Sequence, residues 1–111
     1  MGSSIPQSER PLVRREQLPL PRPYIPPRTA TEQQLAEIWR TVLTMDAVGI
    51  EDGYYDLGGD SFLATAIFSM IEERFQVSIP MATLIGAPTI AQLALKIDAL
   101  LSSGAIGKLQ A

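Results

Sequence analysis

A serine follows two glycines and an aspartate in the stretch DLGGDS, residues 56–61, and a helix-forming apolar sequence begins directly after it. A hydroxyl at such a corner could act as a nucleophile if a neighbouring base removed its proton. The chain contains no histidine and no cysteine, which excludes a Ser-His-Asp triad, thiolate catalysis and cysteine-ligated zinc. We therefore expect Ser61 to be modified by a separate enzyme that supplies the base.

The residues before Ser61 have a simple structural interpretation. Gly58 and Gly59 permit backbone conformations that a Cβ would penalise, so the chain can turn sharply into a helix. Asp60 or Ser61 would then cap that helix, because Asp and Ser are both favoured at the N-cap. Capping alone would account for this corner without any further function.

Two features favour a docking site over a simple cap. The loop before the corner is expected to create a negative field that attracts a basic partner, because it contains no Lys or Arg among five carboxylates: Asp46, Glu51, Asp52, Asp56 and Asp60. The helix after the corner has a core stripe of Ala64, Ile67, Phe68, Ile71 and Phe75, yet further apolar side chains lie outside it: Phe62, Leu63, Ala66 and Met70. In a domain this small, such an excess favours a docking surface.

Helical periodicity predicts the elements that position this corner. A first helix starts at a capping box, either Thr29 with Glu32 or Thr31 with Gln34, and buries Leu35, Ile38, Trp39, Val42 and Leu43. A loop over residues 45–59 is expected to be pinned to the core by Val48, Ile50, Tyr55 and Leu57. The second helix should run from about Ser61 to Phe75.

Two further helices complete the predicted fold. A short one begins with Pro80 at its first position and ends by Gly86. The last opens at Pro88 and Thr89, with Gln92 completing a capping box, and buries Ile90, Leu93, Ala94, Ile97 and Leu101. No strand-like alternation is present. The sequence predicts an all-α fold, a small four-helix bundle of three main helices and one short helix, with a long first loop.

The length of 111 residues allows one domain. Met1–Ser4 is typical of an expression remnant, and the remainder of residues 1–28 is rich in Pro and Arg, which predicts an extended, poorly packed interdomain linker. The folded domain is expected over residues 29–101 and a flexible tail over 102–111. From Thr29 onward four basic residues face ten carboxylates, so nucleic acid is not an expected partner. Without a long apolar run, we expect no membrane association and a cytoplasmic location.

The motif D-x-x-Y-D-L-G-G-D-S, from Asp52 to Ser61, resembles the peptidyl carrier (thiolation) domains of nonribosomal peptide synthetases, within the acyl carrier protein-like family. TEQQLAEIW before it and IPMATLIGAPTIAQLA after it extend the resemblance over about residues 28–101. The resemblance implies that a phosphopantetheinyl transferase attaches 4'-phosphopantetheine from coenzyme A to Ser61, with Gly58, Gly59 and Asp60 as supporting motif residues. The thiol of that arm would hold an aminoacyl or peptidyl thioester, which accounts for the missing cysteine.

The same resemblance implies partners. Leu18-Pro19-Leu20-Pro21 resembles the LPxP element between an adenylation domain and its carrier domain. A non-catalytic, monomeric carrier domain would pass its cargo from this upstream adenylation domain to a downstream condensation, thioesterase or tailoring domain. Its expected docking face contains Phe62 and Thr65 on the second helix and Met81 and Ile85 on the short one, although core packing of the last two is the alternative.

Three other functions fit parts of the sequence. An acyl carrier domain of a polyketide or fatty acid pathway would use Ser61 in the same way. The carboxylates of the loop suggest calcium binding, but the spacing lacks the ligand pattern of an EF-hand, so no metal site is expected. A protein-interaction bundle would use the apolar surface and leave the corner as ordinary capping.

Overall fold

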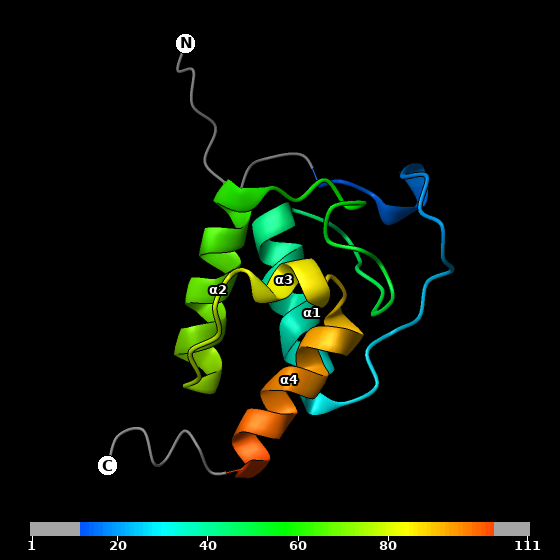
Figure 1. The fold of residues 1–111 in the computed structure, drawn as a ribbon. Helices are drawn as coiled ribbons and strands as arrows, with labels where there is room; N and C mark the ends of the chain where they lie inside the picture. Colours follow the sequence, from blue (N-terminus) through cyan, green and yellow to red (C-terminus); the bar gives the residue numbers. More distant parts are fainter. Residues whose placement is uncertain (1–11, 104–111) are drawn as a thin grey trace.

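The computed structural model describes residues 12–103, and in that range the fold is all-α, as predicted (Figure 1). Helix α1 spans Ala30–Leu43, α2 Ser61–Phe75, α3 Thr83–Gly86 and α4 Ile90–Ser103, and a short 3-10 helix, η2, spans Arg15–Gln17. Helix α1 packs against both α2 and α4. The one backbone bridge of strand type in this range joins Val13 to Met45. None of the helices in residues 12–103 is long and apolar enough to cross a membrane.

The first helix begins at the predicted cap. The Thr29 hydroxyl accepts a hydrogen bond from the Glu32 N–H, but the Glu32 carboxylate does not return to Thr29 as a capping box requires. It accepts instead from the backbone N–H and the guanidinium of Arg28, both at 2.8 Å, and this side-chain hydrogen bond lowers the pKa of Glu32. The Thr31 hydroxyl donates to Asp98 at 2.6 Å and so ties α1 to α4.

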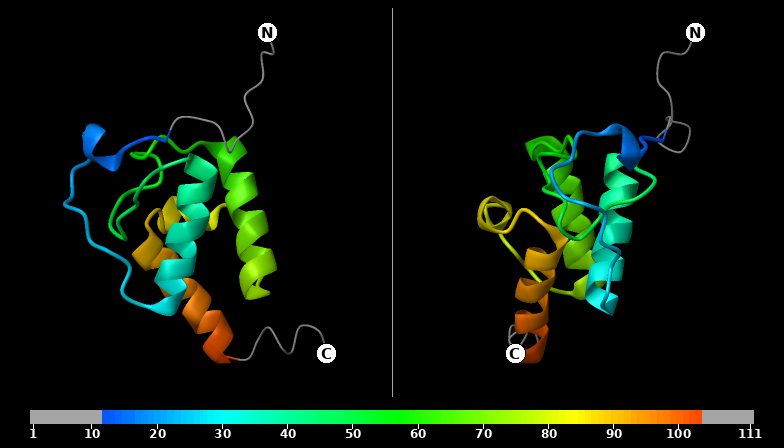
Figure 2. Two further views of the ribbon diagram at one scale, coloured as in Figure 1. Left: turned by 180° about the vertical axis from the view of Figure 1, so that it is seen from behind. Right: turned by 90° about the vertical axis from the view of Figure 1, so that its right-hand side faces the viewer.

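The predicted core stripes of α1 and α2 face the centre of the bundle, and only Leu43 among them is partly exposed. In α4 the stripe is buried up to Ile97, but Leu101 is 45% exposed, so its predicted burial is wrong. The last turn of α4 extends past the ends of α1 and α2 in both Figures 1 and 2. Leu101 lies in that turn on the side away from the core, whereas Leu100 beside it still packs against the core.

The long loop is pinned by a different tyrosine from the one predicted. Tyr54 is fully buried, whereas Tyr55 is 54% exposed. The reason is a helical turn at this point, in which the Leu57 N–H donates to the carbonyls of Gly53 and Tyr54. Residues three apart share a face in such a turn, so Tyr54 and Leu57 point inward together.

The short third helix starts later than predicted. Pro80 is not its first residue, because Met81 and Ala82 form a turn that is closed by the Thr83 N–H donating to the Pro80 carbonyl at 2.9 Å. The helical residues Thr83–Gly86 follow, with Leu84 buried. The predicted cap of α4 is present, since the Thr89 hydroxyl accepts from the Gln92 N–H at 3.3 Å.

Residues 12–28 pack on the bundle, so the prediction of a poorly packed linker is wrong for this segment. It runs beside α1 and the long loop in both views of Figure 2. Leu18, Leu20 and Ile25 lie partly buried against the core, and the Ile25 carbonyl accepts from the Ile50 N–H at 3.0 Å. The predicted expression remnant and most of the predicted tail lie outside the described residues.

Candidate functional site

The serine corner is capped by Asp60 and leaves Ser61 unengaged. Asp60 has extended backbone angles, and its carboxylate accepts from the Leu63 N–H at 2.8 Å. Ser61 is the first residue of α2 and is exposed. Its hydroxyl has no hydrogen-bond partner among residues 12–103. Of the two cap residues considered, Asp60 therefore has the structural role, and the Ser61 hydroxyl is not needed for the cap.

The two glycines of the corner are required for different reasons. Gly58 has a φ of +91°, a conformation that side chains disfavour. Gly59 instead lies against the Tyr54 ring, and a Cβ at this position would overlap the ring carbons. The sequence predicted the sharp turn, but not this close approach.

The buried side chain of Tyr54 contacts the corner that leads to Ser61. Tyr54 was not among the predicted site residues. Its hydroxyl donates to the Asp60 carbonyl at 2.7 Å, and its backbone N–H donates to the Pro88 carbonyl at 2.8 Å. Its ring meets Trp39 edge to face, with centroids 5.4 Å apart. Tyr54 therefore connects α1, the segment that leads into α4 and the residue before Ser61. The three-residue spacing to Leu57 was the signal that could have revealed it.

Burial raises the pKa of Tyr54 to about 12. We expect a component of the ultraviolet absorbance change of tyrosine ionisation with a midpoint near that pH, and we expect Tyr54→Phe to lack it. An unfolded tyrosine ionises near pH 10. The unfolded state would thus release its proton first, so stability should fall as the pH rises from about 10 to 12. An identical titration curve for Tyr54→Phe would contradict this assignment.

The negative field before the corner is weaker than the sequence suggested. Asp52 is buried and forms an ion pair with Arg15, and Asp46 accepts from the Arg15 N–H. Asp60 caps α2, which leaves Glu51 and Asp56 as the loop carboxylates with no hydrogen bond or ion pair to the described residues. No group of three or more potential metal ligands occurs within residues 12–103.

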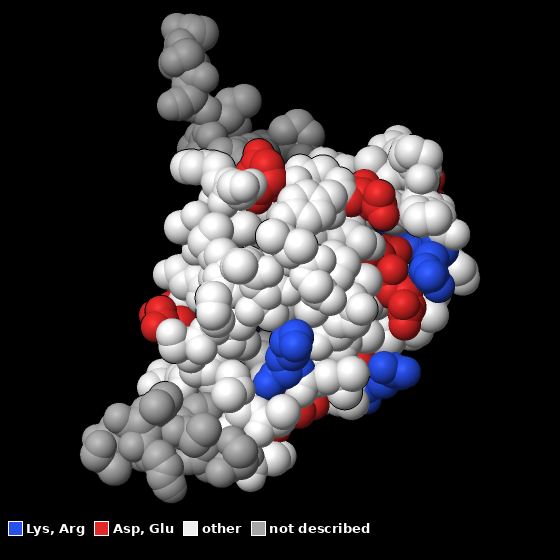
Figure 3. Space-filling view, viewed as in Figure 1, with Lys and Arg blue, Asp and Glu red and all other residues white. Residues whose placement is uncertain are grey.

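The four residues predicted to dock partners are accessible. Phe62 is 82% exposed and Ile85 is 76% exposed. The Thr65 hydroxyl lies 3.7 Å from the Met81 sulfur, so the start of α2 and the turn before α3 meet. Met81 is 40% exposed, which makes core packing a poor description of either Met81 or Ile85. The surface over α2 and α3 is largely uncharged, with acidic and basic side chains near its margins (Figure 3).

The described residues thus form a small helical bundle with an exposed serine at a helix start, next to a largely uncharged face. Residues 33–97 match the family model described as "Phosphopantetheine attachment site". The chain belongs to this family, and 4'-phosphopantetheine is accordingly its cofactor.

Similar sequences occur in peptide synthases. The chain is 39% identical over 97 residues to tyrocidine synthase 3 of Brevibacillus parabrevis, and 46% identical over 83 residues to chondramide synthase cmdD of Chondromyces crocatus. These matches cover 81% and 74% of this chain, but 2% of each synthase. The chain thus corresponds to one small part of such proteins.

Similar solved structures show which kind of carrier domain the chain is. A peptidyl carrier protein in complex with the phosphopantetheine transferase Sfp and coenzyme A matches with 36% identity and a TM-score of 0.67, over 68% of this chain and 99% of that one. An active-site mutant of a peptidyl carrier protein matches with 34% identity and a TM-score of 0.68, over 71% and 88%. The chain is a peptidyl carrier domain of the nonribosomal peptide synthetase type.

Proposed function

We propose that Ser61 is the attachment residue for 4'-phosphopantetheine and that Gly58, Gly59 and Asp60 hold it in place. The observation that carries this proposal is the exposed Ser61 hydroxyl, which has no partner in the described part of the chain and is not needed for capping. In the reaction, the Ser61 oxygen would form a phosphodiester with the pantetheine arm, and coenzyme A would release adenosine bisphosphate. The proton of the hydroxyl would pass to a base of the transferase.

The attached arm would supply the thiol that holds an aminoacyl or peptidyl group as a thioester. The chain itself would act as a carrier, and the reactions on its cargo would be performed by its partners. Its partners would be a phosphopantetheinyl transferase, an upstream adenylation domain, and a downstream condensation, thioesterase or tailoring domain. The monomeric state and the cytoplasmic location expected from the sequence remain predictions.

Incubation of the purified chain with coenzyme A and a broad-specificity transferase tests this proposal. We expect the intact mass to increase by one phosphopantetheine group and no more, because one serine combines an exposed hydroxyl with the glycine corner. A known peptidyl carrier protein in a parallel reaction shows that the transferase is active. Failure of the folded chain to gain mass beside a loaded control would contradict the proposal.

We further propose that the transferase docks on the face formed by Phe62, Thr65, Met81 and Ile85. A charge at Phe62 or Met81 should lower kcat/KM for loading by about tenfold, since a buried apolar contact in an interface is worth about 1–2 kcal/mol. Circular dichroism of Phe62→Asp and Met81→Asp should not change, because both side chains are exposed.

Leu101→Asp is the matched control for these docking variants. Leu101 has an exposure similar to that of Met81, but it lies in the last turn of α4, at the opposite end of the bundle from the start of α2 (Figure 1). We expect its loading rate to equal that of the unmodified chain. An equal loss in Leu101→Asp would show that added charge slows loading wherever it is placed, and would remove the support for this face.

A further inference from the structure

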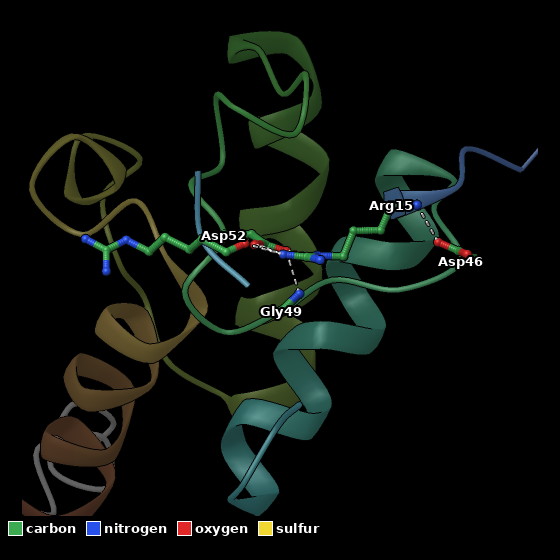
Figure 4. A network of polar contacts seen from close by, with 5 residues as sticks. Arg15, Asp46, Gly49 and Asp52 are labelled. Carbon is green, nitrogen blue, oxygen red and sulfur yellow. Dashed lines mark hydrogen bonds and ion pairs between the residues drawn. The ribbon is translucent and has the colours of Figure 1, made fainter. Parts of the chain in front are cut away.

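Arg15 makes a two-pronged ion pair with Asp52 that fastens the N-terminal segment to the long loop (Figure 4). Its Nε and Nη2 atoms donate to the two carboxylate oxygens of Asp52, each at 2.6 Å. The Asp52 side chain is fully buried and that of Arg15 is 15% exposed. The Gly49 N–H donates to the same carboxylate at 2.7 Å, so the charge of Asp52 is fully engaged.

The same arginine organises its own segment. Its Nη2 donates to the Arg22 carbonyl at 3.0 Å, and its guanidinium carbon lies 5.3 Å from the centre of the Tyr24 ring. Its backbone N–H donates to Asp46 at 2.8 Å. The neighbouring Arg14 offers a contrast, since among residues 12–103 its side chain pairs only with Glu16, and both of those side chains are largely exposed.

Backbone hydrogen bonds hold the segment at both ends. Near its start, the Val13 N–H donates to the Thr44 carbonyl at 2.8 Å and the Asp46 N–H donates to the Val13 carbonyl at 3.0 Å. Near its end, the Ile50 N–H donates to the Ile25 carbonyl at 3.0 Å. Between these points the prolines cannot donate hydrogen bonds, so the polar part of the attachment depends strongly on Arg15.

We propose that residues 12–28 form a strap that is latched to the carrier domain by the Arg15–Asp52 pair, and that this latch sets the reach of Ser61 from the preceding part of the chain. While the latch is closed, residues 12–28 are held on the domain. When it opens, these residues add to the tether that leads to Thr29. A fully extended chain spans at most about 3.5 Å per residue, so release would lengthen the tether by up to about 60 Å. The importance of this reach rests on the proposed carrier function.

Loss of the latch should free the strap without unfolding the bundle. A buried carboxylate that loses its paired cation is unfavourable, but departure of the strap would expose Asp52 to water and relieve that cost. Arg15 is not a member of the buried core cluster, to which α1, α2 and α4 all contribute. The strap therefore has two states, and the ion pair favours the docked one.

Amide hydrogen exchange by NMR on the full chain tests the latch. The N–H groups of Asp46 and Ile50 donate to strap carbonyls, so their protection reports docking. In Arg15→Ala we expect both to exchange at least tenfold faster, while the helix amides of α1 and α2 keep their rates. Arg14→Ala is the matched control and should leave all these rates unchanged. Unchanged protection of both amides in Arg15→Ala would overturn the proposal.

If Arg15→Ala does not fold, Arg15→Lys provides a second test of the latch. Lysine keeps the charge but cannot form the two parallel hydrogen bonds, so protection at Ile50 should fall to an intermediate level with the bundle intact. Wild-type protection in Arg15→Lys would overturn the latch.

The reach of the strap can be measured on the chain without phosphopantetheine. The result is therefore independent of the assignment of Ser61 as the attachment residue. The chain has no cysteine, and dyes can be placed through Leu12→Cys and Ser69→Cys, both at exposed positions. Energy transfer between them should fall in Arg15→Ala and not in Arg14→Ala. Equal transfer in both variants would contradict a longer reach.

Discussion

Replacing Ser61 with alanine is expected to abolish loading with phosphopantetheine completely and to leave the fold intact. The variant removes the oxygen that would form the phosphodiester, and no other group can replace it. The cap of α2 is provided by Asp60, so its hydrogen bond to the Leu63 N–H remains. Alanine also has a higher helix propensity than serine, by up to about 0.5 kcal/mol. Intact mass spectrometry measures the loading, and thermal unfolding followed by circular dichroism measures the stability.

Ser69→Ala is the matched control for this result. Ser69 lies on the same helix and is also exposed, but it is in the interior of α2 and not at its start. We expect it to load at the wild-type rate. A mass increase in Ser61→Ala would show that another hydroxyl accepts the group, and the site would then have to be reassigned.

The helices were predictable because their signals are local. Periodic apolar residues and a cap residue define each long helix, and the predicted bounds of α2 agree with the structure. The corner was predictable for the same reason, since Gly58, Gly59 and Asp60 act on the backbone beside them. The predicted docking residues are exposed because they lie outside the core stripe of α2 or on the short helix α3 and the turn before it.

The contacts that could not be predicted join residues far apart in the sequence. Arg15 and Asp52 are both charged, and composition places each of them in solvent. Only the fold brings them together and buries them. The prediction that the proline-rich strap is poorly packed was wrong for the same reason. Its prolines indicate an extended chain, but they do not show whether that chain is docked on the domain. Tyr54 and Tyr55 are indistinguishable by type, and the spacing of three residues from Tyr54 to Leu57 is the one sequence signal for the turn that buries Tyr54.

Gly59→Ala is expected to disrupt the corner more than any other glycine substitution in the domain. The added Cβ would overlap the Tyr54 ring, which is fully buried and held at its hydroxyl by Asp60 and at its backbone by Pro88. The ring has no free space to enter, since Trp39 lies against it. Overpacking of this kind costs about 1–3 kcal/mol or more. We expect a lower melting temperature together with slower loading, because a displaced Tyr54 no longer holds the residue before Ser61.

Alanine substitutions at two other glycines distinguish the effect of this overlap on stability from the general effect of adding a methyl group. Gly86 lies in α3 with open space where a Cβ would be, so Gly86→Ala should leave stability unchanged or slightly raised. Gly58 also has open space but a positive φ, so Gly58→Ala should be destabilised by about 1–2 kcal/mol through backbone strain alone. The expected order of melting temperatures is Gly86→Ala, then Gly58→Ala, then Gly59→Ala. If Gly59→Ala were as stable as Gly86→Ala, the Tyr54 ring would have to be mobile, and its role in holding the Ser61 corner would be lost.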